Sequence, residues 1–315
     1  MHTTKKKLAL MLFILLLSIC IFIGLFLFWN FSVKDAYIET TEFSTEIETE
    51  KIDTSSTETH SEVSPLSKLS YVEQCELDFV DRPVKRTREE AVEKIKELSQ
   101  YFPALYHVYA NEEKYPLELL LSGAGNPEMT DFLYGYLTSD GSITGGFTDD
   151  EQPEDYPLFL QWDVRWGYLP YGKNGTVGSS GCGPACLSMA VFYLTGNRSC
   201  TPGSIANFSL NNGYYMEGVG TSWSLLDDYP IPYGLTVGHP SLDESVLKAE
   251  LDKGNYLICS VRPGDFTSEG HFILIYGYDE NGFKINDPKC VYRSRLSWTY
   301  DQIQDDIKRI WSVGH

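Results

Sequence analysis

The stretch GSSGCGPACLSMAVFYL, residues 178–194, decides the fold of this 315-residue chain. Its second half is apolar nearly all round and ends close to Gly196, which predicts a helix buried on every side. Glycines flank Cys182 at the point where the preceding loop becomes this helix. Unpaired N–H groups and the positive end of the helix dipole favour a thiolate there. Cys182 is therefore a candidate nucleophile, although a core cysteine that opens an ordinary helix would show the same pattern.

A nucleophilic cysteine needs a base, and His271 is the histidine best placed to serve as one. The tripeptide Glu269-Gly270-His271 leads directly into the apolar run of residues 272–276. A polar ring at the start of a buried strand needs either a hydrogen-bond partner or a task. We therefore predict that His271 is the base, with a hydrogen-bonded core histidine as the alternative.

A hairpin then returns the chain towards His271. Three segments have the composition of strands: residues 256–261, 272–278 and 282–285. Asn281-Gly282 is a strong hairpin signal, and Pro288 ends the returning strand so that Asp287 lies at its tip, as a residue that orients the imidazole. Simple pairing about the turn places Asp287 nearer residues 274–276 than His271. A bulge or a strong twist is therefore expected if Asp287 has this role.

The tetrahedral intermediate of such a reaction also needs hydrogen-bond donors for its oxyanion. Gln161 offers a side-chain amide upstream of the nucleophile, and the backbone N–H of Cys182 would be its partner. On its own Gln161 is an ordinary polar residue near the start of a strand. Only its combination with the other three residues makes it a candidate oxyanion donor.

Helices precede strands along the chain. In residues 71–150, Thr87 and Glu90 form a capping-box signature before a first helix, and two further helices each begin near a proline. Beyond this region the composition shifts to aromatic residues, glycines and β-formers, and residues 300–311 are predicted to form a final amphipathic helix. This order indicates an α+β fold: a small helical subdomain, then a two-lobed domain at residues 151–315 in which the buried helix accompanies an antiparallel sheet.

The first thirty residues predict a membrane location. Lys5, Lys6 and Lys7 precede residues 8–29, which carry no charge. At 1.5 Å per residue, a helix of that length spans the roughly 30 Å hydrocarbon core of a bilayer. We expect a transmembrane signal anchor at residues 1–32 with a cytoplasmic N-terminus. The acidic, Ser/Thr-rich residues 33–70 are expected to form a disordered stalk, so that the rest of this single-pass protein lies outside the cytoplasm.

The composition excludes several classes of partner. A formal net charge of −19 leaves no basic face for nucleic acid. The segment GYLPYGKN at residues 167–174 imitates a phosphate loop but has Asn where a Mg²⁺-binding Ser or Thr belongs, so no nucleotide is expected. The sequence contains no HExxH motif and no His/Cys cluster, so we expect no metal and no cofactor. The seven cysteines form no disulfide framework and are expected to be mostly buried free thiols.

Four motifs together resemble the papain-like, bacteriocin-processing (double-glycine leader) peptidase family, and most closely its stand-alone, membrane-anchored branch. They lie within residues 157–311: Gln161 with the DVRW of residues 163–166, GCGP at 181–184, GHF at 270–272 and NDP at 286–288. The resemblance implies a papain-like two-lobed fold, with Cys182 as nucleophile, His271 as base, Asp287 as its orienting partner and Gln161 as oxyanion donor. Leader peptidases precede an ABC transporter, whereas no ATPase follows here, so export of the substrate is not expected.

The sequence therefore predicts a membrane-anchored, extracytoplasmic cysteine peptidase that hydrolyses peptide or isopeptide bonds in a peptide or protein. Two alternatives stay open. A cell-wall amidase or endopeptidase of the NlpC type also uses Cys before His, and an external location admits peptidoglycan peptides as substrates. A non-catalytic papain-like module displayed on a stalk is the other alternative, with aromatic residues such as Trp162 and Trp223 lining a binding groove.

Overall fold

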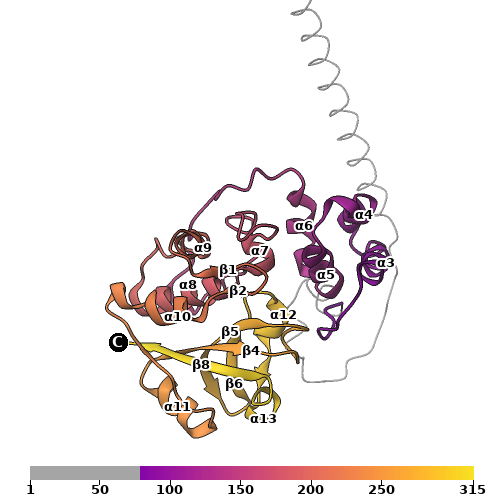
Figure 1. Cartoon of the computed structure of the whole chain (residues 1–315). Coiled ribbons are helices and arrows are strands. Elements are labelled where there is room, and N and C mark those ends of the chain that lie inside the picture. Colours follow the sequence, from indigo (N-terminus) through magenta and orange to yellow (C-terminus); the bar gives the residue numbers. More distant parts are fainter. Residues whose placement is uncertain (1–78) are drawn as a thin grey trace, which may run out of the picture. The chain divides into compact units, whose positions relative to one another are not determined.

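The computed structural model describes residues 79–315 (Figure 1). The signal anchor expected at residues 1–32, the stalk expected at 33–70 and the first residues of the helical subdomain lie outside this part of the chain, so they stay predictions. Within residues 79–315, no helix is both long enough and apolar enough to cross a membrane.

Residues 79–137 form a helical segment with a hydrophobic core of its own (Figure 1). Its helices are α3 (Arg88–Leu98), α4 (Ala104–Ala110), α5 (Leu117–Gly125) and α6 (Thr130–Tyr136), with the 3-10 turns η2 (Glu112–Lys114) and η3 (Pro127–Met129) between them. The predicted capping box begins α3, since the Thr87 hydroxyl accepts a hydrogen bond from the Glu90 N–H at 3.2 Å. Helix α4 has no such signature and was not predicted. All four helices contribute buried side chains, among them Ile95, Leu105, Leu120 and Phe132.

Helix α8 (Cys182–Thr195) is the centre of a second hydrophobic core. Every residue from Gly183 to Tyr193 is buried, as the all-round apolar pattern predicts. The helix ends at Gly196, whose φ of 65° lies in the left-handed region. Short elements surround α8: η4 (Pro153–Asp155), α7 (Val177–Ser180), α9 (Pro202–Asn211), the hairpin of β1 (Tyr215–Met216) and β2 (Gly220–Thr221), α10 (Trp223–Asp228) and η5 (Ile231–Tyr233).

A six-stranded antiparallel sheet forms the other lobe, with the strand order β3-β8-β4-β5-β6-β7. The strands are β3 (Thr236–Gly238), β4 (Tyr256–Val261), β5 (His271–Asp279), β6 (Gly282–Asn286), β7 (Ser297–Trp298) and β8 (Ile307–Gly314). Three further helices accompany them: α11 (Glu244–Asp252), α12 (Val291–Arg295) and α13 (Tyr300–Ile303).

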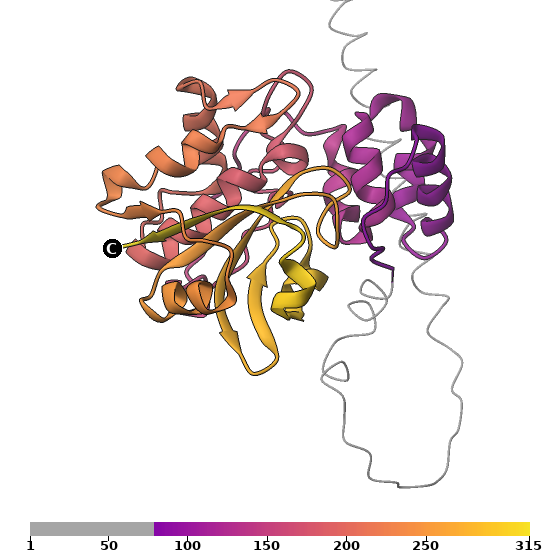
Figure 2. The same cartoon turned by 60° about the horizontal axis from the view of Figure 1, so that its bottom comes forward.

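Both faces of the sheet are buried, which explains why β4 and β5 are apolar without alternation. Ile258 and Leu274 belong to the core around α8, whereas their chain neighbours Leu257 and Ile273 belong to a separate core with Leu247 of α11. In Figure 2 the pink α8 and the orange α11 lie on opposite sides of the strands. The helical and antiparallel layers confirm the predicted α+β class.

The prediction of a final helix over residues 300–311 is wrong. Only α13 is helical there, and β8 is an internal strand between β3 and β4. Ile303, Ile307 and Trp311 recur at a spacing that also fits one face of a helix. In the structure Ile310 and Trp311 contribute to different cores on the two sides of the sheet. A strand that is buried on both faces lacks the alternation that would distinguish it from a helix.

Candidate active site

Cys182 opens α8, and its half-buried side chain lines a cleft of about 900 Å³. Close packing requires the glycines on either side of it. A Cβ atom on Gly181 would lie 2.5 Å from the carbonyl oxygen of Val177, and one on Gly183 would lie 2.9 Å from the Thr221 side chain. The glycine-cysteine-glycine pattern therefore reflects the tight approach of α7 and β2 to the start of α8.

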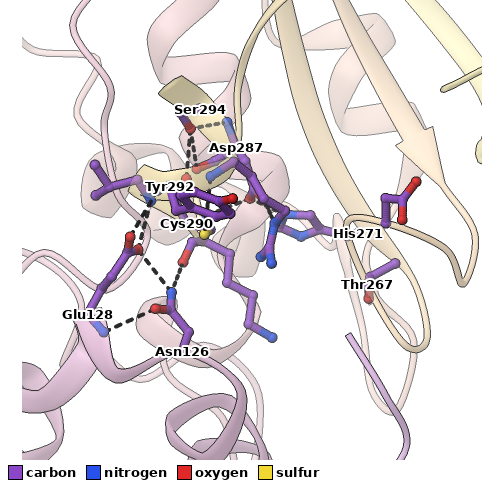
Figure 3. A network of polar contacts seen from close by, with 12 residues as sticks. Asn126, Glu128, Thr267, His271, Asp287, Cys290, Tyr292 and Ser294 are labelled. Carbon is purple, nitrogen blue, oxygen red and sulfur yellow. Dashed lines mark hydrogen bonds and ion pairs between the residues drawn. The ribbon is translucent and has the colours of Figure 1, made fainter. Parts of the chain in front are cut away.

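His271 is the first residue of β5, and its buried ring lies between Cys182 and Asp287. Nε2 of the ring is 2.7 Å from Oδ1 of Asp287 (Figure 3). This contact leaves Nδ1 as the ring nitrogen that can interact with the Cys182 thiol, whose pKa the ring lowers. The structure thus joins three of the four predicted residues in one chain of contacts, from thiol to imidazole to carboxylate.

A β-bulge in the hairpin of β5 and β6 brings Asp287 towards His271. The register has two parts: Gly277 pairs with Lys284 near the turn, and Ile275 pairs with Ile285 beyond the bulge. Continued to the end of β6, the second register places Asp287 opposite Ile273 instead of Leu274, one residue closer to His271. Asp287 and His271 then become diagonal neighbours, which is within reach of an imidazole and a carboxylate. Of the two distortions that were expected, a bulge or a strong twist, the bulge is present.

Arg293 is a member of this cluster that the sequence did not reveal. Its Nε donates a hydrogen bond to Oδ2 of Asp287 at 2.6 Å, and the two side chains are 8% and 0% exposed. The backbone N–H of Lys289 donates to Oδ1 at 2.8 Å. Both carboxylate oxygens are therefore held, one by Arg293 and the other by His271 and Lys289. Nothing in the sequence of α12 distinguishes Arg293 from the exposed Arg295, so only the fold identifies it.

These contacts shift the pKa values in the direction that a reactive thiolate needs. Burial raises the pKa of Asp287, but the charges of Arg293 and His271 outweigh it and hold that pKa below its usual range. Burial lowers the pKa of His271, yet the charge and hydrogen bond of Asp287 raise it to about 9. Burial also raises the pKa of Cys182, but the hydrogen bond and charge of His271 bring it below its ordinary value. Together these directions favour a thiolate–imidazolium pair at neutral pH.

The other cysteines of residues 79–315 are less accessible than Cys182. They are free and fully buried, as most of the cysteines were expected to be. Burial raises the pKa of the thiols of Cys186, Cys259 and Cys290, which keeps them protonated. Among the described cysteines, therefore, Cys182 alone combines partial exposure with a lowered pKa.

Gln161 lies in the wall of the same cleft and is 1% exposed. Its backbone N–H donates to the carbonyl oxygen of Pro288 at 2.7 Å, which ties it to the loop of Asp287. Its side-chain Nε2 donates to the carbonyl oxygen of Gly178 at 2.8 Å. An amide nitrogen carries two hydrogens, and the carbonyl oxygen of Gly178 accepts only one of them. Its Oε1 has no hydrogen-bond partner among the described residues.

The helical segment also reaches this site (Figure 3). The Glu128 carboxylate accepts hydrogen bonds from the backbone N–H groups of Val291 and Tyr292, at 2.8 and 2.9 Å. Asn126 donates from Nδ2 to the carbonyl oxygen of Lys289 at 2.9 Å. These three bonds satisfy the start of α12 and hold the chain between Asp287 and Arg293. The partners lie 163 or 164 residues apart, so no local sequence signal predicts them.

A cysteine at the start of a buried helix, a histidine at the start of a strand and a carboxylate behind that histidine define a site of the cysteine-peptidase type. A family model described as the Peptidase_C39 like family matches residues 153–313. The chain belongs to this family, which confirms the resemblance at the level of the family. No curated protein matches the chain. A crystal structure described as a C39-like peptidase from Bacillus anthracis is similar at 15% identity with a TM-score of 0.33, covering 51% of this chain and 95% of that one. The family assignment rests on the family model.

Proposed function

We propose that the chain is a cysteine peptidase in which Cys182 is the nucleophile, His271 the general base and Asp287 the residue that orients the imidazole. The observation that carries this proposal is the chain of contacts from the Cys182 thiol through His271 to Asp287, at the edge of an open cleft. A histidine with a purely structural role needs only a hydrogen-bond partner. His271 has one in Asp287 and in addition lowers the pKa of a partly exposed thiol. Membership of the family supports the same class of reaction.

In the proposed reaction the Cys182 thiolate attacks the carbonyl carbon of the scissile bond, and the electron pair of the C=O bond moves to the oxygen. The backbone N–H of Cys182 and the free N–H of Gln161 Nε2 are the proposed donors to that oxyanion. The His271 imidazolium gives its proton to the leaving amine as the C–N bond breaks, which leaves a thioester. The neutral imidazole then takes a proton from water, whose oxygen attacks the thioester and releases the acid and the thiolate.

The cleft favours a peptide over a small compact ligand. The β1–β2 hairpin forms one wall through residues 215–221, and the ends of β4 and β5 form another through residues 260–263 and 269–272. These walls come from turns and strand ends, which offer backbone groups to an extended chain. Peptide or isopeptide bonds are therefore the proposed substrates.

The proposed location is the cell membrane, with the N-terminus in the cytoplasm and the catalytic domain outside it. The lysines at positions 5–7 and the uncharged residues 8–29 support this location. Substrates would then be extracytoplasmic peptides or proteins, including peptides of the cell wall. In cells that express the full chain, we expect the protein in the membrane fraction and its C-terminal domain to be degraded by protease added from outside. A chain that is recovered in the soluble fraction would contradict this location.

The reaction is tested with the full-length chain and the variant Cys182→Ala. The wild-type chain is expected to cleave members of a peptide library or of a set of purified cell-wall peptides, and the variant none. Cys186→Ala is the matched control, because it alters a buried thiol one turn further along the same helix and should retain cleavage. Turnover by Cys182→Ala would rule out this nucleophile. Tight peptide binding without cleavage by the wild-type chain would instead favour a binding module.

A further inference from the structure

Lys289 enters the cleft of Cys182 from a backbone that is fixed on both sides. Its N–H donates to Oδ1 of Asp287 at 2.8 Å. Its carbonyl oxygen accepts from Nδ2 of Asn126 at 2.9 Å and from Nε1 of Trp162 at 2.8 Å. Its half-buried side chain lines the cleft. Hydrogen bonds with Asp287, Asn126 and Trp162 therefore fix the position of the Lys289 backbone.

The ammonium group of Lys289 has no anionic partner within residues 79–315, where its Nζ forms neither an ion pair nor a hydrogen bond. The neighbouring carboxylate, Asp287, is already paired with Arg293. Three glutamates line the same cleft without pairing with Lys289: Glu118, Glu217 and Glu269. Burial and the positive charge of Arg293 lower the pKa of Lys289, and the negative charges of Asp287 and Cys182 offset this effect only in part.

Lys289 lies on the side of the site where the leaving part of a substrate is expected. In the proposed reaction His271 delivers a proton to the leaving amine, so the leaving segment lies on the side of His271 and Asp287. Lys289 follows Asp287 by two residues, and its N–H is bonded to that carboxylate. A cation that is half-buried and unpaired at this position is ready to receive an anion from the segment that departs.

We infer that Lys289 is a specificity-determining residue that binds a carboxylate in the leaving part of the substrate. The carboxylate is either an acidic side chain next to the scissile bond or the terminal carboxylate of a short leaving peptide. The inference rests on the proposed peptidase function. With a formal net charge of −19, the chain as a whole repels acidic peptides, so acceptance of such a substrate depends on a cation placed beside the catalytic residues.

The test compares the full-length wild-type chain with Lys289→Met and Lys308→Met. Lys308 also lines the cleft, but its ammonium lies over the Trp223 ring, 5.1 Å from the centroid, so it is the matched control. One pair of peptides carries Glu or Gln directly after the scissile bond, and a second pair has a free or an amidated C-terminus, which separates the two sources of carboxylate. In one of the two pairs, the wild-type kcat/KM for the peptide with the carboxylate should be about tenfold higher than for its neutral partner. This ratio should fall to about one in Lys289→Met and persist in Lys308→Met.

Equal kcat/KM values within both pairs for the wild-type chain would overturn the inference and leave the peptidase function intact. The same loss of preference in Lys308→Met would also overturn it. A charge reversal, Lys289→Glu, should make the neutral peptide the better substrate, a switch that misfolding cannot produce.

Peptide binding to Cys182→Ala separates this inference from the proposed function. Tighter binding of the acidic peptide, lost when Lys289→Met is added, would support the Lys289 site even if the wild-type chain cleaved no peptide. In that case the proposed function alone would fail. Equal binding of the acidic and neutral peptides by Cys182→Ala would overturn the inference.

Discussion

Replacing Arg293 by methionine removes one of the two cations that hold the buried carboxylate of Asp287. The Arg293 Nε lies 2.6 Å from Oδ2 of Asp287, and the Asp287 side chain is fully buried. The carboxylate then keeps His271 and one backbone N–H but loses its ion pair with Arg293. Removing one partner of a buried pair costs about 3–5 kcal/mol, because the remaining charge is left buried with less compensation. Since domains unfold at a cost of about 5–15 kcal/mol in total, this loss is a large fraction of the stability.

The free energy of unfolding of the full-length chain is measured by urea denaturation with tryptophan fluorescence. Arg295→Met is the matched control, because Arg295 lies on the same short helix, is exposed and has no ion pair among the described residues. It should change stability by less than about 0.5 kcal/mol. Asp287→Asn added to Arg293→Met should recover part of the loss, since it removes the buried charge that Arg293 no longer pairs with. A loss below about 1 kcal/mol in Arg293→Met, or an equal loss in both arginine variants, would refute the reasoning.

Three further outcomes are expected. As the pH increases, kcat/KM should rise at a pH below the ordinary thiol pKa of about 8.5, because the pKa of Cys182 is lowered. It should fall again as His271 loses its proton near pH 9. A kcat/KM that still increases above that pH would contradict the thiolate–imidazolium pair. Glu128→Ala should reduce kcat more than it raises KM and lower the free energy of unfolding by about 2 kcal/mol, because two backbone N–H groups of α12 lose their acceptor. The control variant Glu113→Ala, at an exposed position, should change neither quantity. Equal effects of the two variants would exclude a positioning role for Glu128. Gln161→Ala should lower kcat by about a hundredfold with little change in KM, and an unchanged kcat would remove Gln161 from the oxyanion site.

Features with a local cause could be predicted from the sequence. Thr87 and Glu90 lie three residues apart and cap each other, so their signature needs no knowledge of the fold. The buried helix follows from an apolar run that allows no solvent-facing side. The β5–β6 hairpin forms where expected, although its two-residue turn is Glu280-Asn281 and Gly282 begins β6 with a φ of 130°. Turn chemistry specifies that a turn exists more firmly than it specifies the register.

Features whose cause lies far away in the sequence could not be predicted. Arg293 binds the carboxylate of Asp287 only because α12 folds back over the loop, and Glu128 reaches that helix from a separate segment. In the sequence alone, neither Arg293 nor Glu128 can be distinguished from a charged residue on the surface. The strand β8 was mistaken for a helix for a related reason, since its burial on both faces depends on helices contributed by other parts of the chain.

The charges around Asp287 explain why the protonation states of the Cys182 thiol and the His271 imidazole depend on each other. Arg293 is always a cation, and the pKa of Asp287 is held so low that this group is always an anion. These two charges cancel, so a protonated His271 is balanced only if Cys182 is a thiolate. Protonating the thiol leaves a surplus positive charge in a buried site, which favours loss of the histidine proton. The four groups Cys182, His271, Asp287 and Arg293 therefore carry no net charge together. The positive charge of Lys289 is additional to them, and in our proposal the substrate neutralises it.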